Sequence, residues 1–255
     1  MLEKSSNPAF SGNVFNSQAQ SYTQQNTMTI KGTANKSLTL LGLILVSALV
    51  TWKMAFAGNA MVMPLMIGGL IVGTIFSFIT IFKPEKAKFT SIVYALAEGL
   101  VLGGVSATYE MSMVNPETGA GSGIVFNAVM LTIGVFFLML YLYRQQIIKP
   151  TRKLAMGLMV AMGAIAIVYL IDMVMGFFGS SVGFIHSSGP LGIIISLVIV
   201  VVAALNFILD FKNVEDGVSQ GAPEYMEWYC AFGMMMTLVW LYLEMLRLLS
   251  KINRE

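Results

Sequence analysis

Cysteine and histidine are almost absent from the sequence, which has one of each in 255 residues. The single cysteine, Cys230, excludes an internal disulfide, and we expect it to be a small core residue. One histidine and one cysteine cannot supply a zinc site. His186 lies in a loop with serines, SSVGFIHSSG, which gives little support to a serine protease. A GxGD-like element for aspartyl proteolysis is also missing, so we expect neither an enzyme nor a bound cofactor.

Charged residues are scarce too, at 11% of the chain, whereas 56% of the residues are hydrophobic. This composition lies outside the range of soluble domains, and no polar run is long enough to form one. Nucleic acid is therefore not an expected partner, whereas the lipid bilayer is. Residues 1–36, rich in Ser, Asn, Gln and Thr, are expected to be a disordered polar tail, and residues 37–255 one membrane domain.

Long apolar runs dominate the sequence. Seven of them lie at about 38–57, 60–82, 89–109, 124–148, 154–178, 190–211 and 225–249. About 20 apolar residues are enough to cross a bilayer as a helix, and the alternating pattern of a barrel strand does not occur. Glycines inside the runs, such as Gly69, Gly99 and Gly103, suit close helix packing. We predict an all-α integral membrane protein, a bundle of seven transmembrane helices.

Lysine and arginine indicate the orientation of the bundle. They gather in the tail and in the loops near 83–88 and 144–153, whereas the loops on the other side have none. The N-terminus is therefore expected in the cytoplasm. Seven spans place the C-terminus outside, although Arg247, Lys251 and Arg254 oppose that placement. A last segment that dips in and returns would give six spans instead; we favour seven because the early loops are strongly basic.

Asp210 is the first candidate for a functional residue. It stands at the end of the sixth apolar run and precedes a segment that is rich in acids. These acids are Glu215, Asp216, Glu224 and Glu227, and the only base among them is Lys212. A carboxylate in or near lipid is costly, so it indicates function by default. We expect Asp210 at the cytoplasmic end of its helix, followed by an acidic loop.

Three further acids lie within apolar runs. Glu98 is about 13 Å from the cytoplasmic end of its helix, near the middle of the membrane. Asp172 is close to the outer face, where it either lines a vestibule or bonds to a neighbour at the interface. Glu244 is expected near the same face, in an ion pair with Arg247 three residues later.

Four stretches carry a resemblance to a known family: MTIKGTANKS, YALAEGLVLGG, DFKNVEDG and LYLEMLRLL. Together with the seven apolar runs, they resemble the bacterial branch of the transmembrane Bax inhibitor motif family over nearly all of residues 28–250. The resemblance implies a seven-helix bundle with the last helix central, in a bacterial inner membrane. It also implies a pH-gated calcium leak, controlled by one carboxylate at the cytoplasmic end of the sixth helix and another in the seventh.

Only the first of these two carboxylates has a clear counterpart, which is Asp210. Counting back about eleven residues from Arg247 gives Met236 at the second position, and methionine cannot titrate. Alignment on the LYL-acid element selects Glu244, which is expected near the opposite face. By depth, Glu98 and Glu227 are better placed to partner Asp210.

We predict a stress-related, pH-sensitive cation leak with calcium as the implied ion. Clustered acids cannot all ionise in a low dielectric, so a proton would break an electrostatic contact and shift a helix. Calcium prefers oxygen ligands, and Asp210 with Glu98 would bind it weakly and transiently. The predicted pathway and gating residues are Asp210, Glu98, Glu227, Asp172 and Glu244. The alternative is a non-enzymatic regulatory protein that binds other membrane proteins, such as a quality-control protease.

Overall fold

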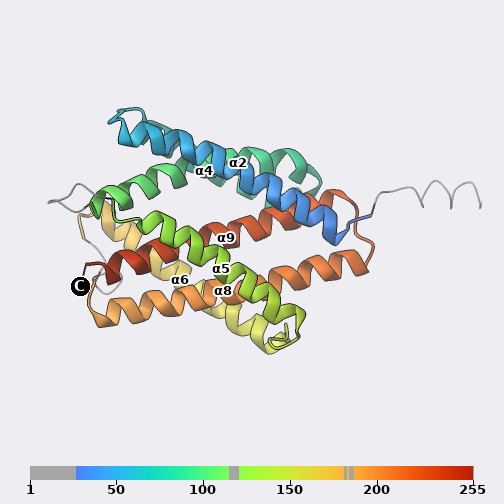
Figure 1. Ribbon diagram of the computed structural model, residues 1–255. Helices are drawn as coiled ribbons and strands as arrows, with labels where there is room; N and C mark the ends of the chain where they lie inside the picture. Colours follow the sequence, from blue (N-terminus) through green and yellow to red (C-terminus); the bar gives the residue numbers. More distant parts are fainter. Residues whose placement is uncertain (1–26, 115–120, 181–182, 184–186, 255) are drawn as a thin grey trace, which may run out of the picture.

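The computed structural model describes residues 27–114, 121–180, 183 and 187–254 (Figure 1). Seven helices in this part of the chain are long and apolar enough to cross a membrane. They are α2 (Ile30–Phe56), α3 (Val62–Phe82), α4 (Ala87–Ser112), α5 (Ile124–Arg144), α6 (Arg152–Phe177), α8 (Pro190–Ser219) and α9 (Tyr225–Ile252), with a short 3₁₀ turn, η2 (Pro84–Lys86), before α4. The predicted all-α, seven-helix membrane protein is confirmed. Residues 1–26 of the predicted tail lie outside the described residues.

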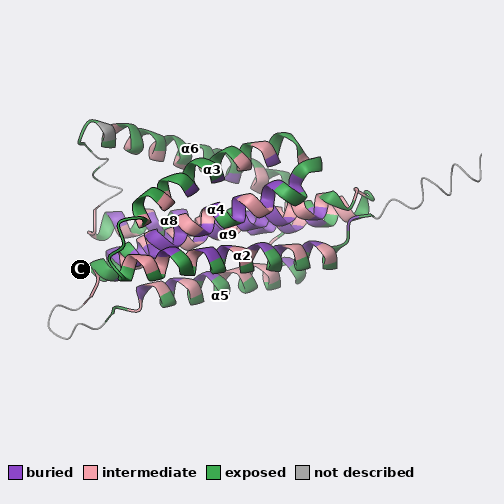
Figure 2. Cartoon of the chain, turned by 90° about the horizontal axis from the view of Figure 1, so that it is seen from above, coloured by how far each residue is buried: buried purple, intermediate pink, exposed green. Residues whose placement is uncertain are grey.

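The bundle is built around α9, which packs against α2, α4, α5 and α8 (Figure 1). We call the end where α2 and α9 begin the N-terminal end, and the end where α9 stops the C-terminal end. About half of the residues of α4 and α9 are buried, whereas α6 has Leu158 as its one buried position among the described residues and packs chiefly against α8 (Figure 2). The central helices carry more polar residues, which a membrane protein places away from lipid. The expected central position of the last helix is confirmed.

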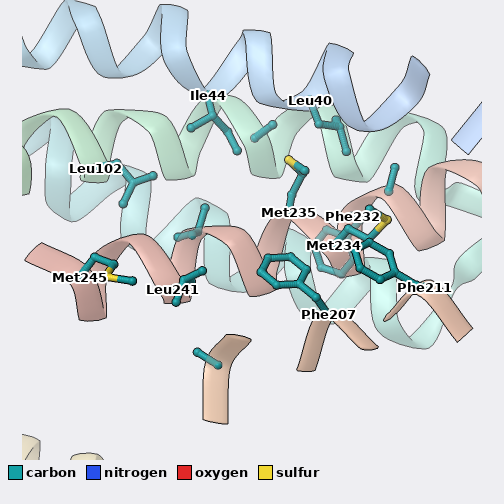
Figure 3. Packing of buried hydrophobic residues seen from close by; sticks show 14 of the residues in the cluster. Leu40, Ile44, Leu102, Phe207, Phe211, Phe232, Met234, Met235, Leu241 and Met245 are labelled. Atoms are coloured by element: carbon teal, nitrogen blue, oxygen red, sulfur yellow. The ribbon is translucent and has the colours of Figure 1, made fainter. Parts of the chain in front are cut away.

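Aromatic and methionine side chains fill the space around α9. The ring of Tyr94 meets Phe232 edge-on at 4.9 Å, and Phe136 meets Phe207 edge-on at 5.2 Å. Such edge-to-face pairs stabilise the packing beyond the area that they bury. Met234 and Met235 are buried in the same cluster (Figure 3), where their flexible side chains fit irregular gaps.

Glycines bring α4 close to α2, as the sequence predicts. A Cβ atom on Gly99 would lie 1.9 Å from the Ser47 hydroxyl oxygen, and one on Gly103 would lie 2.0 Å from the carbonyl oxygen of Ala48. Any side chain at either position would push the two helices apart. The small residues therefore set the α2–α4 distance, as they commonly do in membrane helices.

Two helices extend further than the sequence indicates. Helix α2 begins at Ile30, inside the predicted tail, because the Thr29 hydroxyl caps it by accepting a bond from the Gly32 amide at 2.9 Å. Helix α8 continues to Ser219, so most of the expected acidic loop is helical. An ion pair between Lys212 and Asp216, four residues apart, supports this extension. Asp210 is thus in the interior of its helix, which corrects its predicted place at the end.

Candidate functional site

A pocket of about 370 Å³ lies between α8 and α9, toward the N-terminal end of the bundle. We call it the Asp210 pocket. Its lining residues are Asp210, Asn213, Met226, Tyr229, Cys230 and Gly233. Asp210 comes nine residues before the end of α8, which is roughly 14 Å along the helix axis. The carboxylate therefore lies where the apolar part of α8 meets its polar extension, which begins at Lys212.

One oxygen of the Asp210 carboxylate, Oδ2, is buried and receives no hydrogen bond from the described residues. The Thr237 hydroxyl, one helical turn beyond the pocket on α9, interacts with the carboxylate. Cys230 also lies near enough for the two groups to influence each other. Burying a carboxylate oxygen without a partner is unfavourable, and such groups in native proteins commonly have a functional explanation.

The second carboxylate that the family resemblance implies is missing from the side of α9 that faces Asp210. That side presents Cys230 and Gly233 instead. Met236, at the position counted back from Arg247, is exposed. Among the described residues, Asp210 is therefore the one acid that lines this pocket.

Glu98 faces α3 and does not line the Asp210 pocket. Its Oε2 lies 3.4 Å from the position that a Cβ atom on Gly73 would occupy. Hydrogen bonds to its carboxylate are lacking within the described ranges. The described lining of the Asp210 pocket thus gives the two acids no common cavity, and their partnership and a weak shared calcium site stay predictions.

Glu227 also has a different partner from the one expected. It is buried in the first turn of α9, where it forms an ion pair with Lys36 of α2. Its Oε1 accepts bonds from the Thr29 amide at 2.8 Å and from the Thr29 hydroxyl at 2.9 Å. The Lys36 ammonium also reaches Glu224 at 3.3 Å and lies 5.6 Å from the centre of the Trp228 ring. This cluster joins the start of α2 to the start of α9.

Glu244 lies near the C-terminal end of α9, whereas Asp210 of α8 lies beside the first turns of α9. It is almost fully buried and pairs with Arg247 at 2.9 Å, as the i,i+3 spacing predicts. It also accepts bonds from the Tyr169 hydroxyl at 2.8 Å and from the Trp240 indole N–H at 3.2 Å. Tyr169 bonds to Arg247 as well, so this cluster attaches α6 to α9. Asp172 is half-buried one turn further along α6.

Asp210, Glu98, Glu227 and Glu244 thus each meet different neighbours in the bundle. In the part of the chain that the structure describes, no three His, Cys, Asp or Glu side chains gather as a metal site would require. Depth counts along single helices could not show this, because depth does not say which way a side chain faces. Of the two pockets described among the residues 27–114, 121–180, 183 and 187–254, the Asp210 pocket is lined by a predicted acid and the other is not.

Sequence reasoning missed two features. The Tyr143 hydroxyl donates to Glu215 at 2.6 Å and ties α5 to the extension of α8. A second pocket lies at the C-terminal end, among the basic residues Arg247, Lys251 and Arg254. Their spacing of four and three residues places them on one face of a helix, and that signal was present in the sequence. In the sequence the same residues indicate orientation, and Arg247 also indicates the pair with Glu244.

A family model described as Bax inhibitor 1 like matches residues 7–254 of the chain. No curated protein and no solved structure matches it.

Proposed function

The chain belongs to the Bax inhibitor 1 like family, and from this premise we propose that it is a pH-sensitive cation leak pathway and not an enzyme. In this proposal Asp210 is the group that controls the leak. Calcium is the ion that we expect it to pass. The observation that carries the proposal is a buried Asp210 oxygen at the wall of a pocket, to which no described residue donates a hydrogen bond.

Support comes from the chemistry of the pocket. Hard cations prefer oxygen ligands, and the lining residues Asn213 and Tyr229 have oxygen-bearing side chains beside Asp210. A single carboxylate gives a weak site, which suits an ion that must leave again. Protonation of Asp210 would remove the negative charge and change the contact between α8 and α9.

The experiment is a calcium-flux assay with the purified protein in liposomes, over roughly pH 5 to 8. A single protonation equilibrium shifts about tenfold per pH unit, so the wild-type flux should change severalfold across this range. Asp210→Asn mimics the protonated state and should make the flux independent of pH. Asp216→Asn is the matched control, because Asp216 is on the same helix but more exposed.

A variant Asp210→Asn that keeps the wild-type pH profile would show that Asp210 is not the controlling group. If the wild-type protein passes no cations at all, the leak proposal fails. A regulatory protein that binds other membrane proteins would then be the better explanation, since such a protein needs no flux.

A further inference from the structure

A pocket of about 390 Å³ lies at the C-terminal end of the bundle, the end opposite the start of α2 and α9. We call it the C-terminal pocket. Its volume is in the range of small-molecule sites, roughly 300–1000 Å³. Three cationic side chains line it: Arg247 and Lys251 from the last turns of α9, and Arg254, which follows the end of that helix. The other lining residues all carry hydroxyl groups, and none of the described residues contributes a carboxylate to the lining.

The positive charge of this pocket is not balanced by the described residues. Glu244 neutralises Arg247 by the ion pair at 2.9 Å. Lys251 and Arg254 form no ion pair within the described part of the chain, so two positive charges remain. Arg254 is exposed at the mouth of the pocket, where it can reach a ligand from the aqueous side.

Lys251 is the unusual member of the set, because its side chain is buried. Its ammonium donates to the carbonyl oxygen of Gly192 at 3.0 Å and to the Ser196 hydroxyl at 2.8 Å. Both acceptors are neutral, and an ammonium has a third proton to donate. A buried cation without a counter-charge is costly, so it indicates that an anion belongs nearby.

We propose that the C-terminal pocket binds a phosphate group. A phosphate has several acceptor oxygens that can bond with guanidinium, ammonium and hydroxyl donors at the same time. The lining of cations and hydroxyls provides donors of all three kinds. The inference is independent of the leak proposal, because this pocket and the Asp210 pocket lie toward opposite ends of α9 and share no residue.

Two sources can supply the phosphate group: the headgroup of an anionic lipid, or free phosphate in the aqueous phase. An experiment with the purified, delipidated full-length protein in detergent solution distinguishes the two sources. One arm compares phosphatidylglycerol with diacylglycerol of the same acyl chains, which lacks the phosphate. The other compares inorganic phosphate with chloride at equal ionic strength. The readout is the midpoint of thermal unfolding, because a ligand that binds the folded state raises it.

We expect at least one phosphate probe to raise the midpoint above its phosphate-free control. Stabilisation by phosphatidylglycerol alone assigns a lipid headgroup, and stabilisation by inorganic phosphate assigns the free anion. Arg254→Gln should weaken binding roughly tenfold, because one charge-assisted contact is lost. Arg144→Gln is the matched control, since Arg144 is an exposed arginine near the N-terminal end of the bundle.

Lys251→Met provides a second variant that keeps the apolar stem and removes the charge. It should also lose the phosphate-dependent stabilisation. If neither probe stabilises the wild-type protein, or if Arg254→Gln binds the probe as tightly as Arg144→Gln does, the C-terminal pocket is not a phosphate site.

Discussion

At the scale of single residues, Glu227 shows how a buried acid can serve the architecture of a membrane protein. Its carboxylate receives two bonds from Thr29 and pairs with Lys36, so three polar groups satisfy one another within the bundle. Gly32 leaves the space for it, because a Cβ atom there would lie 2.1 Å from Oε1. A charge in an apolar segment is therefore not by itself a sign of an ion pathway.

Replacement of Glu227 should destabilise the protein. Glu227→Gln leaves the largely buried Lys36 with only its longer contact to Glu224, so we expect a loss of about 3 kcal/mol, typical of a broken buried pair. The side chain of Glu224 is 49% exposed, and Glu224→Gln should cost less than about 1 kcal/mol. Unfolding by denaturing detergent measures both. Equal losses for the two variants would mean that burial of the pair contributes nothing.

At the scale of elements, the contact between α2 and α4 depends on glycine at defined positions. The carbonyl oxygen of Ala48 cannot rotate away from a side chain at residue 103, because it belongs to the helix backbone. Gly68 on α3 has no neighbour within 4 Å of its Cβ position. Both glycines lie inside apolar runs, but Gly103 is packed against a neighbouring helix and Gly68 faces open space.

Gly103→Ala should separate α2 from α4 and cost about 1–3 kcal/mol, as overpacking does. Gly68→Ala should be neutral or stabilising by up to about 1 kcal/mol, because alanine favours the helix more than glycine does. Unfolding of the purified variants in mixed detergent micelles gives both values. A neutral Gly103→Ala would show that the interface is looser than the packing indicates.

The number of helices and the close packing of α4 could be predicted from the sequence. Both depend on features of a single segment: the length of its apolar run and the glycines within it. Helix ends could not: α8 passes through the acids as far as Ser219, where local ion pairing supports the helix. The candidate site could be predicted only as far as Asp210. Glu98 and Glu227 were assigned by depth, whereas rotation about the helix axis decides which neighbour each one meets.

At the scale of the whole molecule, seven crossings put the two described ends of the chain at opposite ends of the bundle (Figure 1). The basic loops near 83–88 and 144–153 lie at the N-terminal end, and the positive-inside rule predicts that this end faces the cytoplasm. Three basic residues at the C-terminal end, Arg247, Lys251 and Arg254, oppose the rule. Binding of a phosphate group would explain why they lie there.

Single cysteines at Thr27 and Asn253, in a Cys230→Ala background, should test this topology. A membrane-impermeant maleimide applied to intact cells should label Asn253→Cys, because it lies outside, whereas Thr27→Cys should react only after the membrane is opened. Labelling of both positions from one side would exclude seven crossings. It would favour a last segment that enters the membrane and returns.

Helix α6 has a consequence for the way in which the membrane itself acts on the protein. It has 26 residues and so extends about 39 Å, whereas the hydrocarbon layer is about 30 Å thick. A helix that is too long for its bilayer tilts, and α6 packs chiefly against α8, with the Tyr169 contact holding it to α9. A thicker or thinner bilayer therefore changes the inclination of α6 first, while the helices around α9 keep their packing.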